Sequence, residues 1–245
     1  MVRLPRLYPI LDAGSFPDAQ GLLAAAEELA AAGCALIQYR NKSDNARAML
    51  EQARGLRGRL ISSSHVSQQR RDVGHPMKEE DHQSQNPHPN VAKNAPLGWG
   101  TQSHVRLIMN DRADLCLAAD FDGVHVGQDD LSPEAVRGII GPDRWLGVST
   151  HNPEQLSEAD LTSADYLAIG PVFSTFSKDK PDPEVGLDGV RRARALTRKP
   201  LVAIGGITRE NADSVIEAGA DSVAVISDLL REPRKSAEEF FRVLR

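Results

Sequence analysis

Short apolar runs alternate with alanine- and leucine-rich amphipathic segments along most of the chain. Residues 105–109 (VRLIM) form an apolar run that stops at Asn110-Asp111, and residues 124–126 (VHV) begin a second run that stops at Gln128-Asp129-Asp130. Between them, residues 113–119 can turn one apolar face inward as a helix. Two buried strands joined by a helix form a parallel βαβ unit, and both predicted strands deliver carboxylates at their C-terminal ends.

The same rhythm predicts eight strand–helix units. Strands are expected at residues 7–11, 34–39, 105–109, 124–126, 145–148, 166–173, 200–204 and 222–226, and helices at 17–32, 44–60, 113–119, after Ser132, after Asn152, and at 187–198, 208–218 and 237–244. This alternation favours an α/β fold, a (β/α)8 TIM barrel forming a single domain over residues 1–245. An open doubly wound sheet is the alternative. The barrel is preferred because Gly205-Gly206 and the Ser227 end of the last strand look like a barrel phosphate site.

Residues 67–105 break the pattern. Only 7 of the 38 residues from 67 to 104 are apolar, four prolines interrupt any helix, and 4 basic residues offset 4 acidic ones. Such a segment cannot bury enough apolar surface to offset its ordering entropy, so we expect a disordered, low-complexity insertion between the second helix and the third strand. Ser64-His65-Val66 recurs as Ser103-His104-Val105, which suggests that the insertion comprises 39 residues, 67–105.

Composition excludes several classes of function. The net charge of −5 provides no basic field for nucleic acid or an anionic membrane. The only cysteines, Cys34 and Cys116, make neither a disulfide framework nor a metal cage. No apolar run approaches the roughly 20 residues that span a bilayer, and residues 1–16 lack the apolar core of a secretory signal. We therefore expect a cytoplasmic protein.

Polar side chains follow the predicted strands at their C-terminal ends, and in a barrel they would converge on one mouth. Arg40, Lys42 and Lys178, with a cation held by Asp111 and Asp130, would suit a polyanion such as pyrophosphate. Oxygen ligands beside substrate phosphates favour Mg²⁺ as that cation. The alternative for the two aspartates is that they only cap the helices that follow.

A second group of polar residues would suit a single phosphate. The hydroxyls of Thr175 and Ser177 are expected near backbone N–H groups at Gly206 and Ser227. Two anion sites in one mouth imply two phosphorylated substrates, or one substrate with two phosphates. His125 is expected to be a strand residue held by packing, whereas His151 is expected at the mouth.

Seven motifs occur along the chain in a fixed order: QYRNK, IMNDR, GVHVGQDD, GVSTH, GPVFSTFSK, AIGGI and AVIS. Together they closely resemble thiamine phosphate synthase, and the resemblance covers the chain except for the insertion. AIGGI alone occurs in many phosphate-binding barrels, so the specificity lies in the ordered set. The resemblance implies a (β/α)8 barrel that joins a hydroxymethylpyrimidine pyrophosphate to a thiazole phosphate, giving thiamine phosphate and pyrophosphate.

The resemblance also implies roles for individual positions. Asp111 and Asp130 match the Mg²⁺ ligands, with Asp129 the weaker candidate of the adjacent pair, and Arg40, Lys42 and Lys178 match the catalytic cations. The positions that match the pyrimidine-pyrophosphate site are Gln38, Tyr39, Arg40, Asn41, Lys42, Asn110, Ser149 and Lys178. Those that match the thiazole-phosphate site are Thr175, Phe176, Ser177, Gly206, Ile226 and Ser227.

The implied reaction is dissociative, through a pyrimidine cation, and it needs no protein nucleophile. Its partners are the two small-molecule substrates, with no nucleic acid and no membrane, and a homo-oligomer is left open. Two alternatives remain. One is a thiazole tautomerase, a sister family of the same fold that uses a histidine near His151 for proton transfer. The other is a non-catalytic phosphate-binding barrel.

Overall fold

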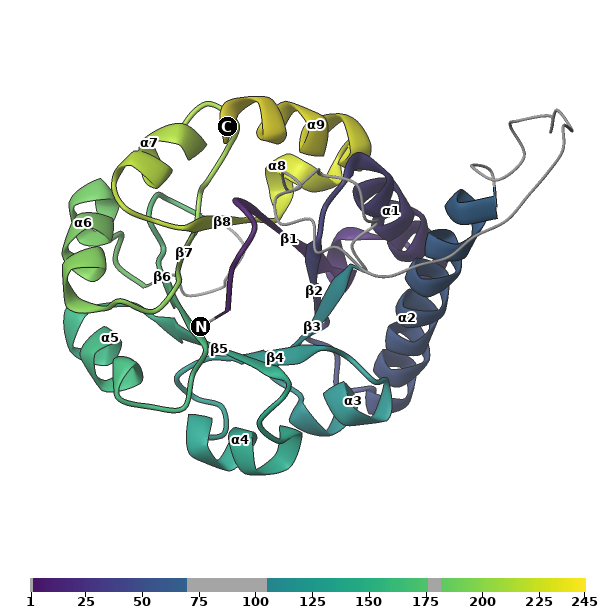
Figure 1. Cartoon of the computed structure of the whole chain (residues 1–245), viewed down its shortest axis with the longest axis horizontal. Helices are drawn as coiled ribbons and strands as arrows, with labels where there is room; N and C mark the ends of the chain where they lie inside the picture. The colour runs from purple at the N-terminus through teal and green to yellow at the C-terminus, as the bar shows by residue number, and fades with distance from the viewer. Residues whose placement is uncertain (1, 70–104, 176–181) are drawn as a thin grey trace, which may run out of the picture.

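The computed structural model describes residues 2–69, 105–175 and 182–245, except the side chains of residues 62–69. Eight parallel strands close into a barrel in sequence order, and a ring of helices surrounds it (Figure 1). The predicted TIM barrel is confirmed. The strands are β1 (Leu7–Asp12), β2 (Leu36–Arg40), β3 (Arg106–Asn110), β4 (Gly123–Val126), β5 (Trp145–Thr150), β6 (Tyr166–Ile169), β7 (Leu201–Ile204) and β8 (Ser222–Val225).

The helices follow the predicted order with shifted ends. They are α1 (Ala19–Ala32), α2 (Ala46–Gln69), α3 (Ala113–Ala118), α4 (Pro133–Ile140), α5 (Pro153–Asp160), α6 (Gly186–Leu196), α7 (Ala212–Glu217), α8 (Ser227–Leu230) and α9 (Pro233–Val243), with a 3-10 turn, η1 (Ala13–Ser15). Helix α7 starts four residues later than expected, after a turn in which the Thr208 N–H donates to the Asn211 side chain. Helix α8 was not predicted.

The ordered fold reaches further into the predicted insertion than expected. Helix α2 continues to Gln69, and Val105 lies in the core with 7% of its surface exposed. Residues 70–104 lie outside the described part of the chain, so the expectation of disorder there stays a prediction.

Helix starts agree with their sequence signals. The side chains of Asp18, Ser132 and Asn152 each accept a hydrogen bond from a backbone N–H in the first turn of α1, α4 and α5. Helix α1 ends at Gly33, whose φ of 103° is the left-handed conformation that glycine adopts without strain. In the described part of the chain, no helix combines the length and the apolar character needed to cross a membrane.

Most strands divide their side chains between two hydrophobic layers, as the period of two requires. Leu7 and Leu11 of β1 belong to the large cluster that packs between sheet and helices, whereas Tyr8 and Ile10 belong to a smaller cluster inside the barrel. Side chains at inward-facing positions are therefore the ones that can reach the barrel interior below its C-terminal opening.

A repeated set of hydrogen bonds ties the strands together at their N-terminal ends. Asp122, Asp165 and Asp221 each immediately precede an even-numbered strand, and we call them the aspartate staples. One carboxylate oxygen of each accepts a hydrogen bond from the N–H of the preceding odd-numbered strand and another from an arginine of the helix before that strand (α2, α4 or α6). The donors are Leu107 and Arg57 at 2.8 and 3.0 Å, Leu146 and Arg137 at 2.8 and 2.7 Å, and Leu201 and Arg194 at 2.8 and 2.8 Å. The strand starts are thus tied together, while the strand ends remain available for chemistry.

Candidate active site

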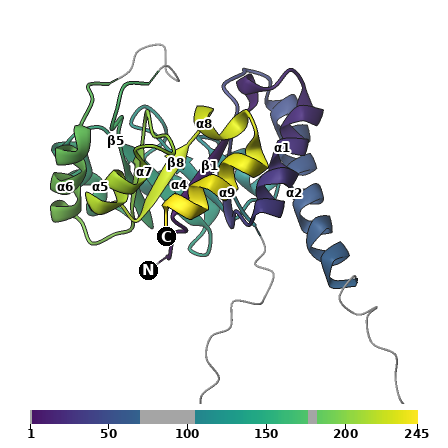
Figure 2. The same ribbon diagram turned by 90° about the horizontal axis from the view of Figure 1, so that it is seen from above.

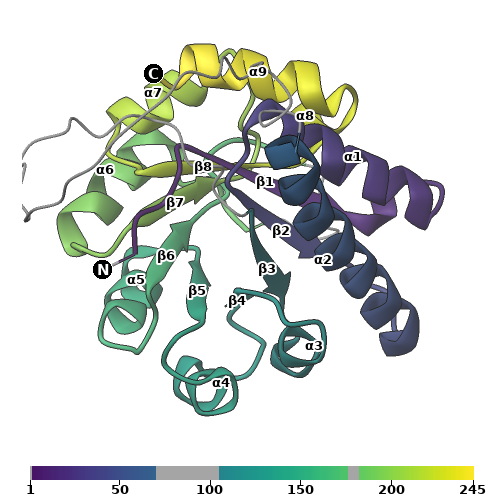
Figure 3. The same cartoon turned by 45° about the vertical axis from the view of Figure 1, so that its right-hand side comes forward.

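The eight strands run in the same direction, so the residues that follow them gather on one rim of the barrel (Figures 2 and 3). The predicted site residues on this rim come from seven of the eight strand ends: Arg40, Lys42, Asn110, Asp111, Asp130, Ser149, Thr175, Gly206, Ile226 and Ser227. Phe176, Ser177 and Lys178 lie outside the described residues. The two predicted anion groups therefore open on the same face, the one that carries activity in TIM-barrel enzymes.

Two cation–carboxylate pairs occupy the rim above β1, β2 and β3. Lys42 Nζ lies 2.5 Å from Asp111 Oδ2, and the Arg40 guanidinium donates to the Asp12 carboxylate. Lys42 is 57% exposed, whereas Arg40 and Asp12 are 18% and 17% exposed. Arg40 is thus held in place by Asp12, and Lys42 stays accessible to an incoming anion.

Asp111 and Asp130 form a pair of neighbouring acids. Burial raises the pKa of Asp130, and the adjacent Asp111 carboxylate raises it further, while the Gly127 N–H and the Lys42 charge act in the opposite direction. Asp111 has a φ of 63°, an uncommon conformation for a residue with a side chain. Two carboxylates held this close repel one another unless a cation or a proton lies between them.

This donor set fits Mg²⁺. Hard oxygen ligands suit the ion, and Mg²⁺ commonly takes only one or two carboxylates from a protein, with substrate phosphates and water completing the shell. Among the described residues, no cluster of three or more histidine, cysteine, aspartate or glutamate side chains could hold a metal by itself. Asp111 and Asp130 could supply two carboxylate ligands to such an ion.

Three polar side chains lie inside the barrel just below the rim. Gln38 is 3% exposed and its Nε2 donates to Tyr8 Oη at 3.0 Å, while Ser149 Oγ lies 2.8 Å from His125 Nε2. Asn110 Nδ2 is buried and has no hydrogen-bond partner among the described residues. A buried donor without a partner is costly, so an acceptor from water or from a ligand would be needed to satisfy it.

The side chains of Tyr39 and Asn41 are not brought to the mouth. Tyr39 is fully buried on the helix side of β2, where its hydroxyl donates to Gln52 Oε1 at 2.6 Å and its ring packs against Phe121. Asn41 Nδ2 donates to Tyr39 Oη at 3.1 Å and to Gln52 Oε1 at 3.0 Å. These two side chains brace the loop that carries Lys42, and their predicted substrate contacts could come only from the backbone.

The loops after β6 and β7 lie directly against each other on the opposite part of the rim. Gly206 has a φ of 63°, and a Cβ there would come within 2.5 Å of the Ser174 carbonyl oxygen. The Phe173 N–H donates to the Gly205 carbonyl at 3.0 Å. Only glycine allows this approach, which places the loop leading to Thr175 over the end of β7.

Helix α8 adds the neighbouring part of this surface. Strand β8 pairs with β7, so Ile226 and Ser227 lie beside Gly206 at the strand ends. Arg209 fixes the helix by donating to both oxygens of Asp228 at 3.0 Å and by pairing with Glu239 of α9. Thr175, Gly206, Ile226 and Ser227 therefore form one continuous region.

The residues that the sequence analysis missed lie inside the barrel. Tyr8, Tyr166 and His125 are buried and hydrogen-bonded to one another and to the predicted site residues Gln38 and Ser149. Burial raises the pKa of both phenols and lowers that of His125 to about 4, so the imidazole is neutral. His125 is buried on β4 and packs against Tyr166, as expected of a strand residue held by packing, but its hydrogen bonds were not foreseen. The signal that could have found the set is the run of polar residues at inward-facing strand positions.

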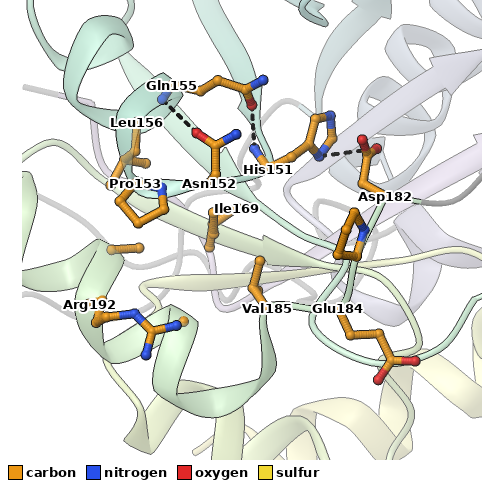
Figure 4. Close-up of a pocket in the computed structure, with 13 residues that line it drawn as sticks. His151, Asn152, Pro153, Gln155, Leu156, Ile169, Asp182, Glu184, Val185 and Arg192 are labelled. Atoms are coloured by element: carbon orange, nitrogen blue, oxygen red, sulfur yellow. Dashed lines mark hydrogen bonds and ion pairs between the residues drawn. The ribbon is translucent and has the colours of Figure 1, made fainter.

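His151 lines a separate cavity between α5 and α6 (Figure 4). This cavity of about 290 Å³ is bounded by residues 151–156 of β5–α5 and by the segment from Asp182 to α6. His151 Nδ1 lies 2.6 Å from the Gly170 carbonyl oxygen, to which it donates, and 3.5 Å from Asp182 Oδ2. Among the described residues that line this cavity are neither the Lys42–Asp111 pair nor Gly206.

A closed (β/α)8 barrel with its cations, acids and glycine-lined loops on the C-terminal rim defines a TIM-barrel enzyme. The family model described as "Thiamine monophosphate synthase" matches residues 90–229. The chain belongs to the thiamine phosphate synthase family, whose members are transferases of thiamine biosynthesis.

Individual relatives agree with that assignment. The thiamine-phosphate synthase of Koribacter versatilis is 50% identical over 246 residues, covering 99% of this chain and 97% of the relative. That of Chloroflexus aurantiacus is 37% identical, covering 91% of this chain and 83% of the relative. The solved thiamine phosphate pyrophosphorylase from Pyrococcus furiosus superposes with a TM-score of 0.72 at 26% identity, covering 98% of this chain and 95% of that chain.

Proposed function

We propose that the rim binds two substrates, a hydroxymethylpyrimidine pyrophosphate and a thiazole phosphate, and couples them to give thiamine phosphate and pyrophosphate. The observation that carries the proposal is that two separate groups of polar residues, both suited to anions, open on one rim. A barrel that bound a single phosphate would have no use for the second group. The tautomerase alternative has no support from His151, whose Nδ1 hydrogen bonds to a backbone carbonyl beside a separate cavity.

The pyrimidine pyrophosphate is assigned to the region formed by the ends of β2 to β5. Arg40 and Lys42 provide positive charge there, and Lys178 is assigned a third charge from its motif alone. Gln38, Asn110 and Ser149 lie below them with groups suited to a nitrogen heterocycle. The unpartnered Nδ2 of Asn110 gives the strongest support, because a ring nitrogen or a phosphate oxygen would satisfy it.

The thiazole phosphate is assigned to the region formed by the ends of β6 to β8. Thr175, Gly206, Ile226 and Ser227 lie there, and Phe176 and Ser177 are assigned by their place in the same motif. Backbone N–H groups at a strand–loop–helix junction are suited to a phosphate dianion. Thr175, Gly206, Ile226 and Ser227, the described residues of this region, include no acidic pair, which distinguishes them from the group around Asp111.

The reaction follows from this arrangement. The carbon–oxygen bond of the pyrimidine methylene breaks, and its electron pair leaves with the pyrophosphate. The thiazole nitrogen then gives its lone pair to the resulting pyrimidine cation and forms the new carbon–nitrogen bond. Arg40, Lys42 and Lys178 stabilise the negative charge that builds on the departing oxygen. The two regions hold the reactants in line, which supplies most of the remaining rate.

Asp111 and Asp130 would hold a Mg²⁺ ion beside the leaving group, where its charge adds to that of the cationic side chains. Lys42 already pairs with Asp111, so its ammonium group is placed to contact the same phosphate oxygens. The raised pKa of Asp130 supports this assignment, because a cation would relieve the repulsion between the two acids.

The assay that tests the proposal mixes the protein with both phosphorylated substrates and Mg²⁺, and measures thiamine phosphate and pyrophosphate. Equal amounts of the two products are expected. The Asp111→Ala and Lys178→Ala variants should each lose about hundredfold in kcat/KM for the pyrimidine substrate. Interconversion of thiazole tautomers without release of pyrophosphate would contradict the proposal and favour the tautomerase.

A further inference from the structure

Five polar side chains cross the barrel interior as one continuous series of hydrogen bonds, which we call the interior chain. Its bonds are Gln38 Nε2 to Tyr8 Oη at 3.0 Å, Tyr8 Oη to Tyr166 Oη at 2.9 Å, Tyr166 Oη to His125 Nδ1 at 3.2 Å, and His125 Nε2 to Ser149 Oγ at 2.8 Å. The members come from β2, β1, β6, β4 and β5. The two ends of the chain are residues assigned above to the pyrimidine site.

The surrounding sequence makes room for the interior chain. A Cβ on Gly147 would lie 2.2 Å from Tyr166 Cζ and 2.3 Å from His125 Nδ1, so a glycine is required where β5 passes these rings. Tyr166 packs edge-on against Tyr8 and tilted against His125, with ring centroids 6.1 and 5.5 Å apart. Branched apolar residues usually fill this part of a TIM barrel, and they carry no desolvation cost.

The bonds of the interior chain have a common direction. Gln38 Nε2 donates to Tyr8 Oη, so Tyr8 can use its own hydroxyl hydrogen to donate to Tyr166 Oη. Tyr166 then donates to His125 Nδ1, and the imidazole donates from Nε2 to Ser149. This leaves the Gln38 amide oxygen as an acceptor and the Ser149 hydroxyl hydrogen as a donor.

One end of the interior chain presents a donor and the other an acceptor, in whichever direction its hydrogen bonds run. Turning the Gln38 amide over reverses every bond, so that Gln38 becomes the donor and Ser149 the acceptor. An aminopyrimidine ring offers a donor at its exocyclic amine and acceptors at its ring nitrogens. The direction found here matches an amine held by Gln38 and a ring nitrogen held by Ser149.

We propose that Tyr8, Tyr166 and His125 are positioning residues that fix which hydrogen-bonding group each end of the interior chain presents to the pyrimidine ring. This inference rests on the proposed assignment of Gln38 and Ser149 to the pyrimidine site. All three are buried, with at most 7% of their surface exposed, so their proposed role is exerted through the two ends. Breaking the chain in its middle frees both ends to rotate and weakens recognition of one substrate only.

The first test compares Tyr166→Phe with Thr150→Val. Tyr166→Phe keeps the ring and removes the central link, so KM for the pyrimidine pyrophosphate should rise about tenfold while KM for the thiazole phosphate stays unchanged. Thr150→Val also removes a buried hydroxyl, one that donates to the Ala168 carbonyl at 2.8 Å, but it does so on the outer face of β5. That control should leave both KM values unchanged.

The second test asks whether the two ends are coupled through the chain. Gln38→Ala and Ser149→Ala should each raise KM for the pyrimidine substrate, and the combined effect should be non-additive by about threefold or more. In the Tyr166→Phe background that coupling should shrink toward additivity. Tyr8→Phe breaks a different link and should give the same selective rise in KM, which keeps the test valid if Tyr166→Phe folds poorly.

Two outcomes overturn the inference in distinguishable ways. If Gln38→Ala and Ser149→Ala leave KM for the pyrimidine substrate unchanged, the site assignment fails and the inference fails with it. The other outcome is that those variants behave as expected, but Tyr166→Phe and Tyr8→Phe raise both KM values equally or leave both unchanged. The interior chain then has a structural role only.

Discussion

His125 is an imidazole enclosed in the barrel, and its burial has a consequence for stability in acid. Its pKa is lowered to about 4, mainly by desolvation, while the charge of Asp130 opposes the shift. The unfolded chain takes up the same proton near pH 6.5. The contribution of His125 to the unfolding free energy is therefore fully present above about pH 6.5 and is lost as the pH drops toward 4. The loss for this group is about 3 kcal/mol.

We expect the His125→Gln variant to lose less stability over that pH interval than the native protein. Urea unfolding measured at neutral pH and near pH 4 gives the two losses, and all other titrating groups contribute equally to both proteins. An identical loss in both proteins would show that His125 titrates normally in the folded state.

Asp130 presents the opposite case, because burial and Asp111 raise its folded pKa. The folded protein then holds that proton more tightly than the unfolded chain, so stability falls as the pH rises through the carboxyl range. Without Mg²⁺ at neutral pH, Asp130→Asn should have a higher Tm than the native protein while its activity drops. Added Mg²⁺ should raise the Tm of the native protein only. A lower Tm for Asp130→Asn in the presence of a chelator would count against the repulsion argument.

At the scale of elements, the aspartate staples hold the barrel at the end opposite the rim. Asp165→Ala removes the acceptor for the Leu146 N–H and for Arg137, and should cost about 2 kcal/mol of unfolding free energy with kcat unchanged. Asp188→Ala is the matched control, because Asp188 pairs with Arg191 on the exposed surface of α6 and its loss should have no measurable effect. The measurement is denaturant unfolding beside the steady-state rate. Equal stabilities for the two variants would refute the role of the staple.

The elements themselves were largely predictable, because apolar runs, caps and glycine stops are local signals. Helix α8 was missed because four residues are too few to show a helical period. The QYRNK motif shows why side-chain direction was harder. Neighbours on a strand point to opposite faces, so Gln38 and Arg40 enter the barrel while Tyr39 packs against helices. The alternation of side chains along a strand predicts these directions, whereas a motif match assigns the same site to all five residues.

The interior chain was not predictable from motifs, since its members are far apart in sequence. Tyr8 and Tyr166 are 158 residues apart and meet only when the barrel closes. The position of Gly147 between two such rings likewise depends on the register of β4, β5 and β6.

At the scale of the whole molecule, the predicted insertion joins α2 to β3 at the strand starts, on the face away from the rim. Deleting residues 67–105 places Val66 where Val105 enters the core, so an equivalent side chain is retained. We expect kcat to stay within about twofold of the native value, because the active groups lie at the other end of the barrel. Steady-state kinetics and circular dichroism check this. A large loss of kcat with the fold preserved would mean that the segment takes part in catalysis.

In the proposed enzyme, one rim holds two anion sites and only one of them is assisted by metal. The most direct measurement determines KM for each substrate as a function of Mg²⁺ concentration, in the native protein and in Asp111→Asn, whose asparagine tolerates the same left-handed backbone. We expect Mg²⁺ to lower KM for the pyrimidine pyrophosphate, to leave KM for the thiazole phosphate unchanged, and to have little effect in the variant. An equal response of both KM values, or an unaltered response in Asp111→Asn, would contradict this expectation.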